Sequence, residues 1–120
     1  LFPPKTEKGM EKLKAVITEL NALDPAYFSV TYGAGGSTQD RTRRIVERIR
    51  RETALEPVAH LTCVGSTREQ LGDLLDSYQQ AGIENILALR GDPPEGMDHF
   101  EVVAGGFAHA SDLVSFIRGR

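Results

Sequence analysis

The feature that most constrains the fold of this chain is a regular alternation between two hydrophobic periods. Residues 7–23 carry apolar side chains at helical spacing, and YFSVTY at residues 27–32 is an aromatic and β-branched run typical of a strand. The alternation then continues as a helix ending near residue 53, a strand at 58–64, a helix before Gly82, a strand at 86–89 and a helix at 110–117. LFPP at residues 1–4 resembles the end of a further strand. Strands that alternate with helices predict an α/β fold with a parallel sheet of right-handed βα units.

Local residue types mark where the predicted helices begin and end. Thr6 is a candidate N-cap of the first helix, and Ser66 followed by Glu69 predicts the start of the third helix. Gly82 is suited to ending that helix, because glycine readily adopts the left-handed conformation of a C-terminal cap.

Unusual polar residues follow several of the predicted strands. Thr31 and Tyr32 lead into the glycine-rich GAGG at residues 33–36, and His60, Thr62 and Cys63 lie near the end of the next strand. The third strand runs into Arg90-Gly91-Asp92 and two prolines. Ligands of parallel α/β sheets bind at the carboxyl ends of the strands, so this distribution predicts an active-site edge.

Each of these signals has a plainer structural interpretation. GAGG lacks the G-x-G-x-x-G spacing of a dinucleotide site, so it is either a flexible turn or a phosphate-binding loop before a helix. A lone strand histidine such as His60 is more often a core residue bonded to backbone than a ligand. Arg90 and Asp92 are equally suited to a structural ion pair at the strand exit. Cys63 is expected to be a small buried residue, and His109 a surface residue.

Composition excludes several classes of function. The 14 basic residues are outnumbered by 17 acidic ones, so the net charge of −3 does not indicate a nucleic-acid-binding surface. The basic run at residues 41–51 has helical apolar spacing and is interpreted as the solvated face of a helix. No apolar run approaches the ~18 residues of a membrane span, and no His or Cys spacing indicates a metal site. The single Cys63 favours a reducing, cytoplasmic setting.

Five motifs, in order along nearly the whole chain, resemble the methylenetetrahydrofolate reductase family. They are LFPPKTEKG at residues 1–9, VTYGAGGSTQDRT at 30–42, PVAHLTCVGST at 57–67, GIENILALRGDPP at 82–94 and GGFAHASDLV at 105–114. The resemblance implies a (βα)8 TIM barrel that carries FAD. It also implies a reaction of one-carbon and methionine metabolism, the reduction of 5,10-methylenetetrahydrofolate to 5-methyltetrahydrofolate with NADH or NADPH.

The resemblance also implies roles for individual residues. Thr31 would lie by the nicotinamide and the flavin, and Asp92 would face both the flavin and the pterin of the folate substrate as a catalytic residue. A carboxylate there disfavours negative charge on the reduced flavin, which should make it a better hydride donor. The remaining expected FAD contacts are Tyr32, Ala34, His60, Arg90, Gly91 and Ala110.

One departure concerns the first motif, which in the family begins with a Glu that acts as general acid. That Glu would directly precede Leu1. The 120 residues are also about half of the ~250 that a barrel requires. We therefore expect residues 1–120 to be the first half of the catalytic barrel, incomplete at both ends, inactive alone and homo-oligomeric when full-length. Two alternatives are a non-catalytic half-barrel that binds or assembles, and a different α/β enzyme that binds phosphate at GAGGS.

Overall fold

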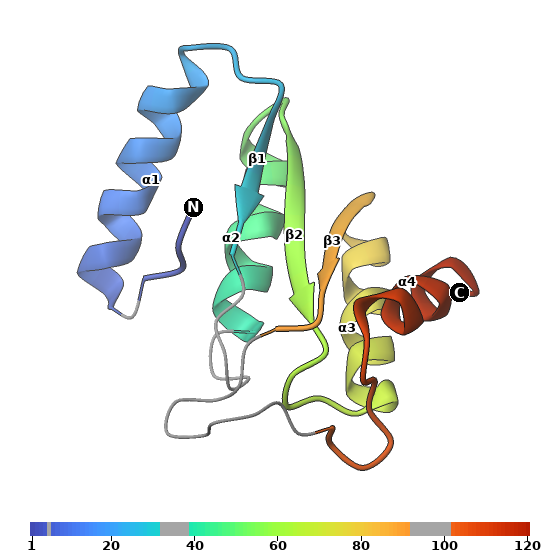
Figure 1. The fold of residues 1–120 in the computed structure, drawn as a ribbon. Helices are drawn as coiled ribbons and strands as arrows, with labels where there is room; N and C mark the ends of the chain where they lie inside the picture. The colour runs from blue at the N-terminus through green and yellow to red at the C-terminus, as the bar shows by residue number, and fades with distance from the viewer. Residues whose placement is uncertain (5, 32–38, 92–101) are drawn as a thin grey trace.

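The computed structural model describes residues 1–4, 6–31, 39–91 and 102–120, in which helices alternate with parallel strands (Figure 1). The elements in chain order are α1 (Glu7–Asn21), β1 (Tyr27–Val30), α2 (Gln39–Glu52), β2 (Glu56–Thr62), α3 (Arg68–Gln80), β3 (Asn85–Leu89) and α4 (Ala110–Arg118). The strands form one parallel sheet in the order β1-β2-β3. The predicted α/β alternation is confirmed, and it is the arrangement expected in the first half of a (βα)8 barrel.

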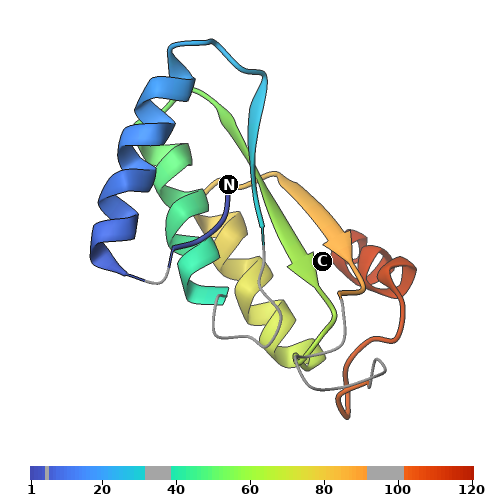
Figure 2. The ribbon, with the colours of Figure 1, turned by 60° about the vertical axis from the view of Figure 1, so that its left-hand side comes forward.

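The helices pack on one face of the sheet, and this face holds the hydrophobic core. Alternate strand residues Phe28, Val30, Ala59 and Leu61 are buried there. Figure 2 shows α2 and α3 side by side along that face, with α4 beyond β3. Phe107, which precedes α4, packs into the same core. The helices contribute Ile45, Ile49, Leu71, Leu75, Tyr78 and Leu113. Each fully buried branched side chain contributes about 1.5–3 kcal/mol, so this single layer of contacts holds the sheet to its helices.

The first residues pair with β1. The terminal amino group of Leu1 donates to the Ser29 carbonyl at 2.8 Å, and the Thr31 N–H donates to the Leu1 carbonyl at 2.9 Å. These two bonds place Leu1 beside β1 as a parallel neighbour would lie, but residues 1–4 form no strand of the described sheet, so the strand end predicted at LFPP is not seen as a strand. Residues 1 and 31 are thereby held beside each other at one edge of the sheet.

The start of α3 differs from the prediction by one residue. Thr67, not Ser66, is the N-cap: its hydroxyl accepts from the Gln70 N–H at 3.2 Å, and the Gln70 side chain accepts from the Thr67 N–H at 2.9 Å. Ser66 is instead buried. Gly65 has a φ of +69°, and this turn brings Thr67 into the extended conformation that capping requires. The predicted Thr6 cap and the Gly82 helix end, with a φ of +78°, are confirmed.

We expect Thr67→Ala to lower the free energy of unfolding by about 1 kcal/mol, because one first-turn N–H loses its acceptor. Urea unfolding of the two proteins measures this difference. Thr18→Ala is the matched control, since Thr18 is an exposed residue within α1 whose hydroxyl only donates to the Lys14 carbonyl. An equal effect of both substitutions would contradict the assignment of Thr67 as a cap.

The basic run in α2 forms the solvated side of an amphipathic helix, as predicted. Ile45, Val46 and Ile49 are buried, whereas the arginines lie at the surface and three of them form ion pairs with carboxylates. Across the parts of the chain that the structure describes, no helix is long and apolar enough to cross a membrane.

Candidate functional site

The two faces of the sheet differ sharply, and the face away from the helices is the one that bears the candidate residues. Side chains alternate along a strand, so His60 lies opposite to the buried Ala59 and Leu61. Its neighbours on that face are only partly buried, and Leu87 and Leu89 are 43% and 38% exposed. No helix among the described segments packs on this face, which corresponds to the interior of a barrel.

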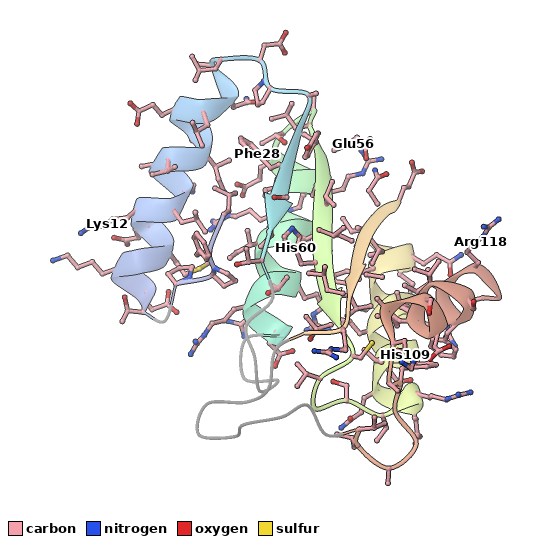
Figure 3. The ribbon with its side chains drawn as sticks, in the orientation of Figure 1. Lys12, Phe28, Glu56, His60, His109 and Arg118 are labelled. Carbon is pink, nitrogen blue, oxygen red and sulfur yellow. The ribbon has the colours of Figure 1, made fainter. Side chains whose placement is uncertain are left out.

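The strand register brings Thr31 and His60 to the same level. Val30 pairs with Ala59, so the next residues along, Thr31 and His60, lie side by side. His60 is also level with Leu87 of β3. Figure 3 places His60 near the middle of the sheet. Extending the printed register by one residue places two of the predicted site residues, from separate strands, at one level, and their shared site stays a prediction.

Thr31 is held by hydrogen bonds on both sides. Its hydroxyl and its backbone N–H both donate to the Leu1 carbonyl, at 3.2 and 2.9 Å. Its own carbonyl accepts from the hydroxyl of the buried Thr42 in α2 at 2.9 Å. The exit of β1 is thus fixed by an adjacent segment and by the following helix.

The pKa of His60 is lowered, so the neutral imidazole is favoured. Partial burial lowers the pKa of His60 below its ordinary value of 6.5. A neutral imidazole offers one donor and one acceptor nitrogen. No other described residue forms a hydrogen bond with this ring. His60 is therefore partly buried and has no backbone partner among the described residues, unlike the core histidine of the plainer interpretation.

The lowered pKa of His60 predicts a pH dependence of stability. Between the folded pKa and 6.5 the unfolded state binds more protons than the folded state, so His60 reduces stability as the pH falls through this window. We expect His60→Gln to lose less stability than the wild type between pH 7.5 and about 5.5. Urea unfolding at both pH values tests this. An identical pH dependence in the two proteins would contradict it.

The exit of β3 requires glycine at position 91. Gly91 has a φ of +90°, and a Cβ built on it would lie 3.0 Å from Val64 Cγ1 and 3.1 Å from Thr62 Cβ. The Cys63 N–H donates to the carbonyls of both Leu89 and Arg90, at 3.0 and 3.2 Å. These bonds hold the backbone of residues 89–91 against the end of β2. Arg90 itself is exposed.

The remaining candidates divide into two groups. Tyr32, Ala34 and Asp92 lie outside the residues that the structure describes, so the prediction that Asp92 shares a face with Thr31 and His60 stays a prediction.

Ala110 begins α4, next to His109, whose carbonyl lies 3.6 Å from Cys63 Sγ. Cys63 is buried, and burial together with the nearby Asp112 carboxylate raises its pKa, as suits a structural thiol. His109 is exposed, as predicted.

Comparison with known proteins agrees with this geometry. The family model described as "Methylenetetrahydrofolate reductase" matches residues 1–120. A probable methylenetetrahydrofolate reductase (NADH) of Oryza sativa subsp. japonica is 46% identical over 99% of this chain and 20% of its own length. The 5,10-methylenetetrahydrofolate reductases of Pectobacterium carotovorum and Escherichia coli K12 are 40% and 39% identical over 98% of this chain.

The chain spans only part of these relatives, covering 37% of the Pectobacterium protein and 38% of the Escherichia coli protein. The similarity nevertheless extends over the whole of the present chain, including the strand ends that carry Thr31, His60 and Gly91. The parallel sheet and its helices agree with the first half of a reductase barrel. The chain belongs to the methylenetetrahydrofolate reductase family.

Proposed function

We propose that this chain is part of the catalytic barrel of an FAD-dependent enzyme that reduces 5,10-methylenetetrahydrofolate to 5-methyltetrahydrofolate with NADH or NADPH. The observation that carries the proposal is the uncovered sheet face, on which Thr31 and His60 lie side by side near the carboxyl ends of β1 and β2. NADH is the favoured reductant, because it appears in the names of the rice, maize and Arabidopsis relatives.

The residues on this face fit a flavin. The neutral His60 can form one directed hydrogen bond to a flat ring system, and the apolar Leu87 of β3 lies level with it. Thr31 and Gly91 bound the site at the strand ends. FAD, when bound, would supply the chemistry of two-electron hydride transfer.

The other predicted contacts complete the proposal. Tyr32, Ala34, Arg90 and Ala110 would contribute to holding FAD. The carboxylate of Asp92 would oppose the build-up of negative charge beside it and hydrogen-bond the pterin of the folate, which favours hydride release toward the substrate. A Glu directly before Leu1 would supply the proton that opens the substrate's ring.

The setting of the enzyme is also a proposal. The buried, free Cys63 with its raised pKa suits a reducing compartment such as the cytoplasm. Folate is the proposed substrate and a homo-oligomer the proposed state of the full-length protein.

The test is purification of the full-length protein, followed by measurement of bound flavin and of NAD(P)H-dependent formation of 5-methyltetrahydrofolate. We expect stoichiometric FAD and turnover. A full-length protein with neither flavin nor turnover would instead support the alternative of a non-catalytic binding module.

A further inference from the structure

Thr62 is a buried residue whose hydroxyl has no hydrogen-bond partner among the residues that the structure describes. The residue is 5% exposed, and its Oγ1 atom is shielded from solvent without a hydrogen bond. Buried hydroxyls are almost always bonded, because a buried unpaired polar atom destabilises the folded state. Thr42 follows this rule, since its buried hydroxyl donates to the Thr31 carbonyl. The unpaired hydroxyl of Thr62 therefore requires an explanation.

Two other buried polar atoms that lack a hydrogen bond have a simpler explanation than Thr62. Arg43 Nε lies 3.9 Å from the Glu47 carboxylate in an ion pair, and Glu56 Oε2 belongs to a carboxylate whose other oxygen pairs with Arg50. Glu56 also lies at the opposite end of β2 from Thr62. Thr62 differs, because its side chain has only one polar atom and that atom is unpaired.

The position of Thr62 links it to the proposed site. It is the last residue of β2, two residues after His60, and so it extends from the same face of the sheet. It is level with Leu89 of β3. The backbone of Gly91 crosses directly beside it, since a Cβ on Gly91 would approach Thr62 Cβ to 3.1 Å. A Cβ at position 91 would press against Thr62, so glycine permits this close approach of the two strand ends.

We propose that Thr62 is a flavin-binding residue, whose hydroxyl donates a hydrogen bond to a carbonyl oxygen or ring nitrogen of the flavin bound at the strand ends. This inference rests on the proposed function. The hydroxyl is shielded in this structure, so the proposal requires a rotation about the Cα–Cβ bond that turns it toward the ligand. The hydroxyl is unpaired without the ligand and satisfied with it.

Two substitutions in the full-length protein separate this role from a structural one. Thr62→Val keeps the shape and removes the hydroxyl, whereas Thr62→Ser keeps the hydroxyl and removes a buried methyl group. We expect the Val variant to unfold, free of FAD, at an equal or higher temperature than the wild type, yet to bind FAD about five- to tenfold more weakly. The Ser variant should unfold at a lower temperature but bind FAD within about twofold of the wild type.

The readouts are thermal unfolding of the flavin-free protein and the dissociation constant for FAD. Thr42→Val is the stability control, and it should unfold at a lower temperature because a satisfied buried hydrogen bond is lost. Equal FAD affinity of the wild type and both Thr62 variants would overturn the inference, as would a Val variant that is less stable without FAD. A wild type that binds FAD but does not reduce folate would refute the proposed reaction alone. One that binds no FAD would overturn both.

Discussion

Replacing Asp92 by Asn in the full-length enzyme should slow hydride transfer to 5,10-methylenetetrahydrofolate by about 10–10²-fold. The substitution preserves the size of the side chain and removes its negative charge. Without that charge, the proposed site no longer opposes negative charge on the reduced cofactor, so hydride is released less readily. Reduction by NADH should be affected less and is expected to stay equal or become faster. Stopped-flow measurement of the two half-reactions separates these effects.

The matched control for Asp92 is Asp73→Asn, because Asp73 is an exposed carboxylate on α3. This variant should transfer hydride at the wild-type rate. If Asp92→Asn leaves the folate half-reaction unchanged, Asp92 is a structural residue of the strand exit and its proposed catalytic role is wrong.

Replacing Gly91 by Ala should destabilise the protein by about 2–5 kcal/mol. The φ of +90° is unfavourable for any residue with a side chain, at a cost of about 1–2 kcal/mol. The added methyl group would also approach Val64 Cγ1 to 3.0 Å and Thr62 Cβ to 3.1 Å, and overpacking of this kind costs about 1–3 kcal/mol. Urea unfolding gives the difference directly.

Gly65→Ala isolates the contribution of the contacts. Gly65 has a φ of +69° but nothing within 4 Å of a built Cβ, so only the backbone cost applies. We expect this control to lose about 1–2 kcal/mol, less than Gly91→Ala. Equal losses at the two positions would show that Thr62 and Val64 do not confine residue 91.

The order of elements was predictable from the sequence because burial imposes a period on each segment. Val30, Ala59 and Leu61 are buried against the helices while the residues between them are not, and this alternation is visible in the chain. The start of α3 was placed one residue early. Ser66-Glu69 and Thr67-Gln70 have equivalent capping chemistry, and the choice between them depends on the backbone turn at Gly65, which residue types do not reveal.

The candidate site was predictable only in part. Parallel strands bring their carboxyl ends together, so the proximity of Thr31 and His60 was expected from the strand order, and the β1–β2 register, extended by one residue, agrees with it. The unpaired hydroxyl of Thr62 could not be foreseen. It depends on the burial of the end of β2, which arises only when this strand has paired with its neighbours. Charge and periodicity can be read from the amino-acid sequence, whereas the lack of a hydrogen-bond partner cannot.

The most direct test of the proposed reaction is an anaerobic titration of the full-length protein, followed by its flavin absorbance. We predict that NADH bleaches the absorbance and that 5,10-methylenetetrahydrofolate then restores it, with one 5-methyltetrahydrofolate formed for each flavin reoxidised. A flavin that NADH bleaches but that folate leaves reduced, or a protein without flavin absorbance, would contradict the assignment of folate reduction to this site.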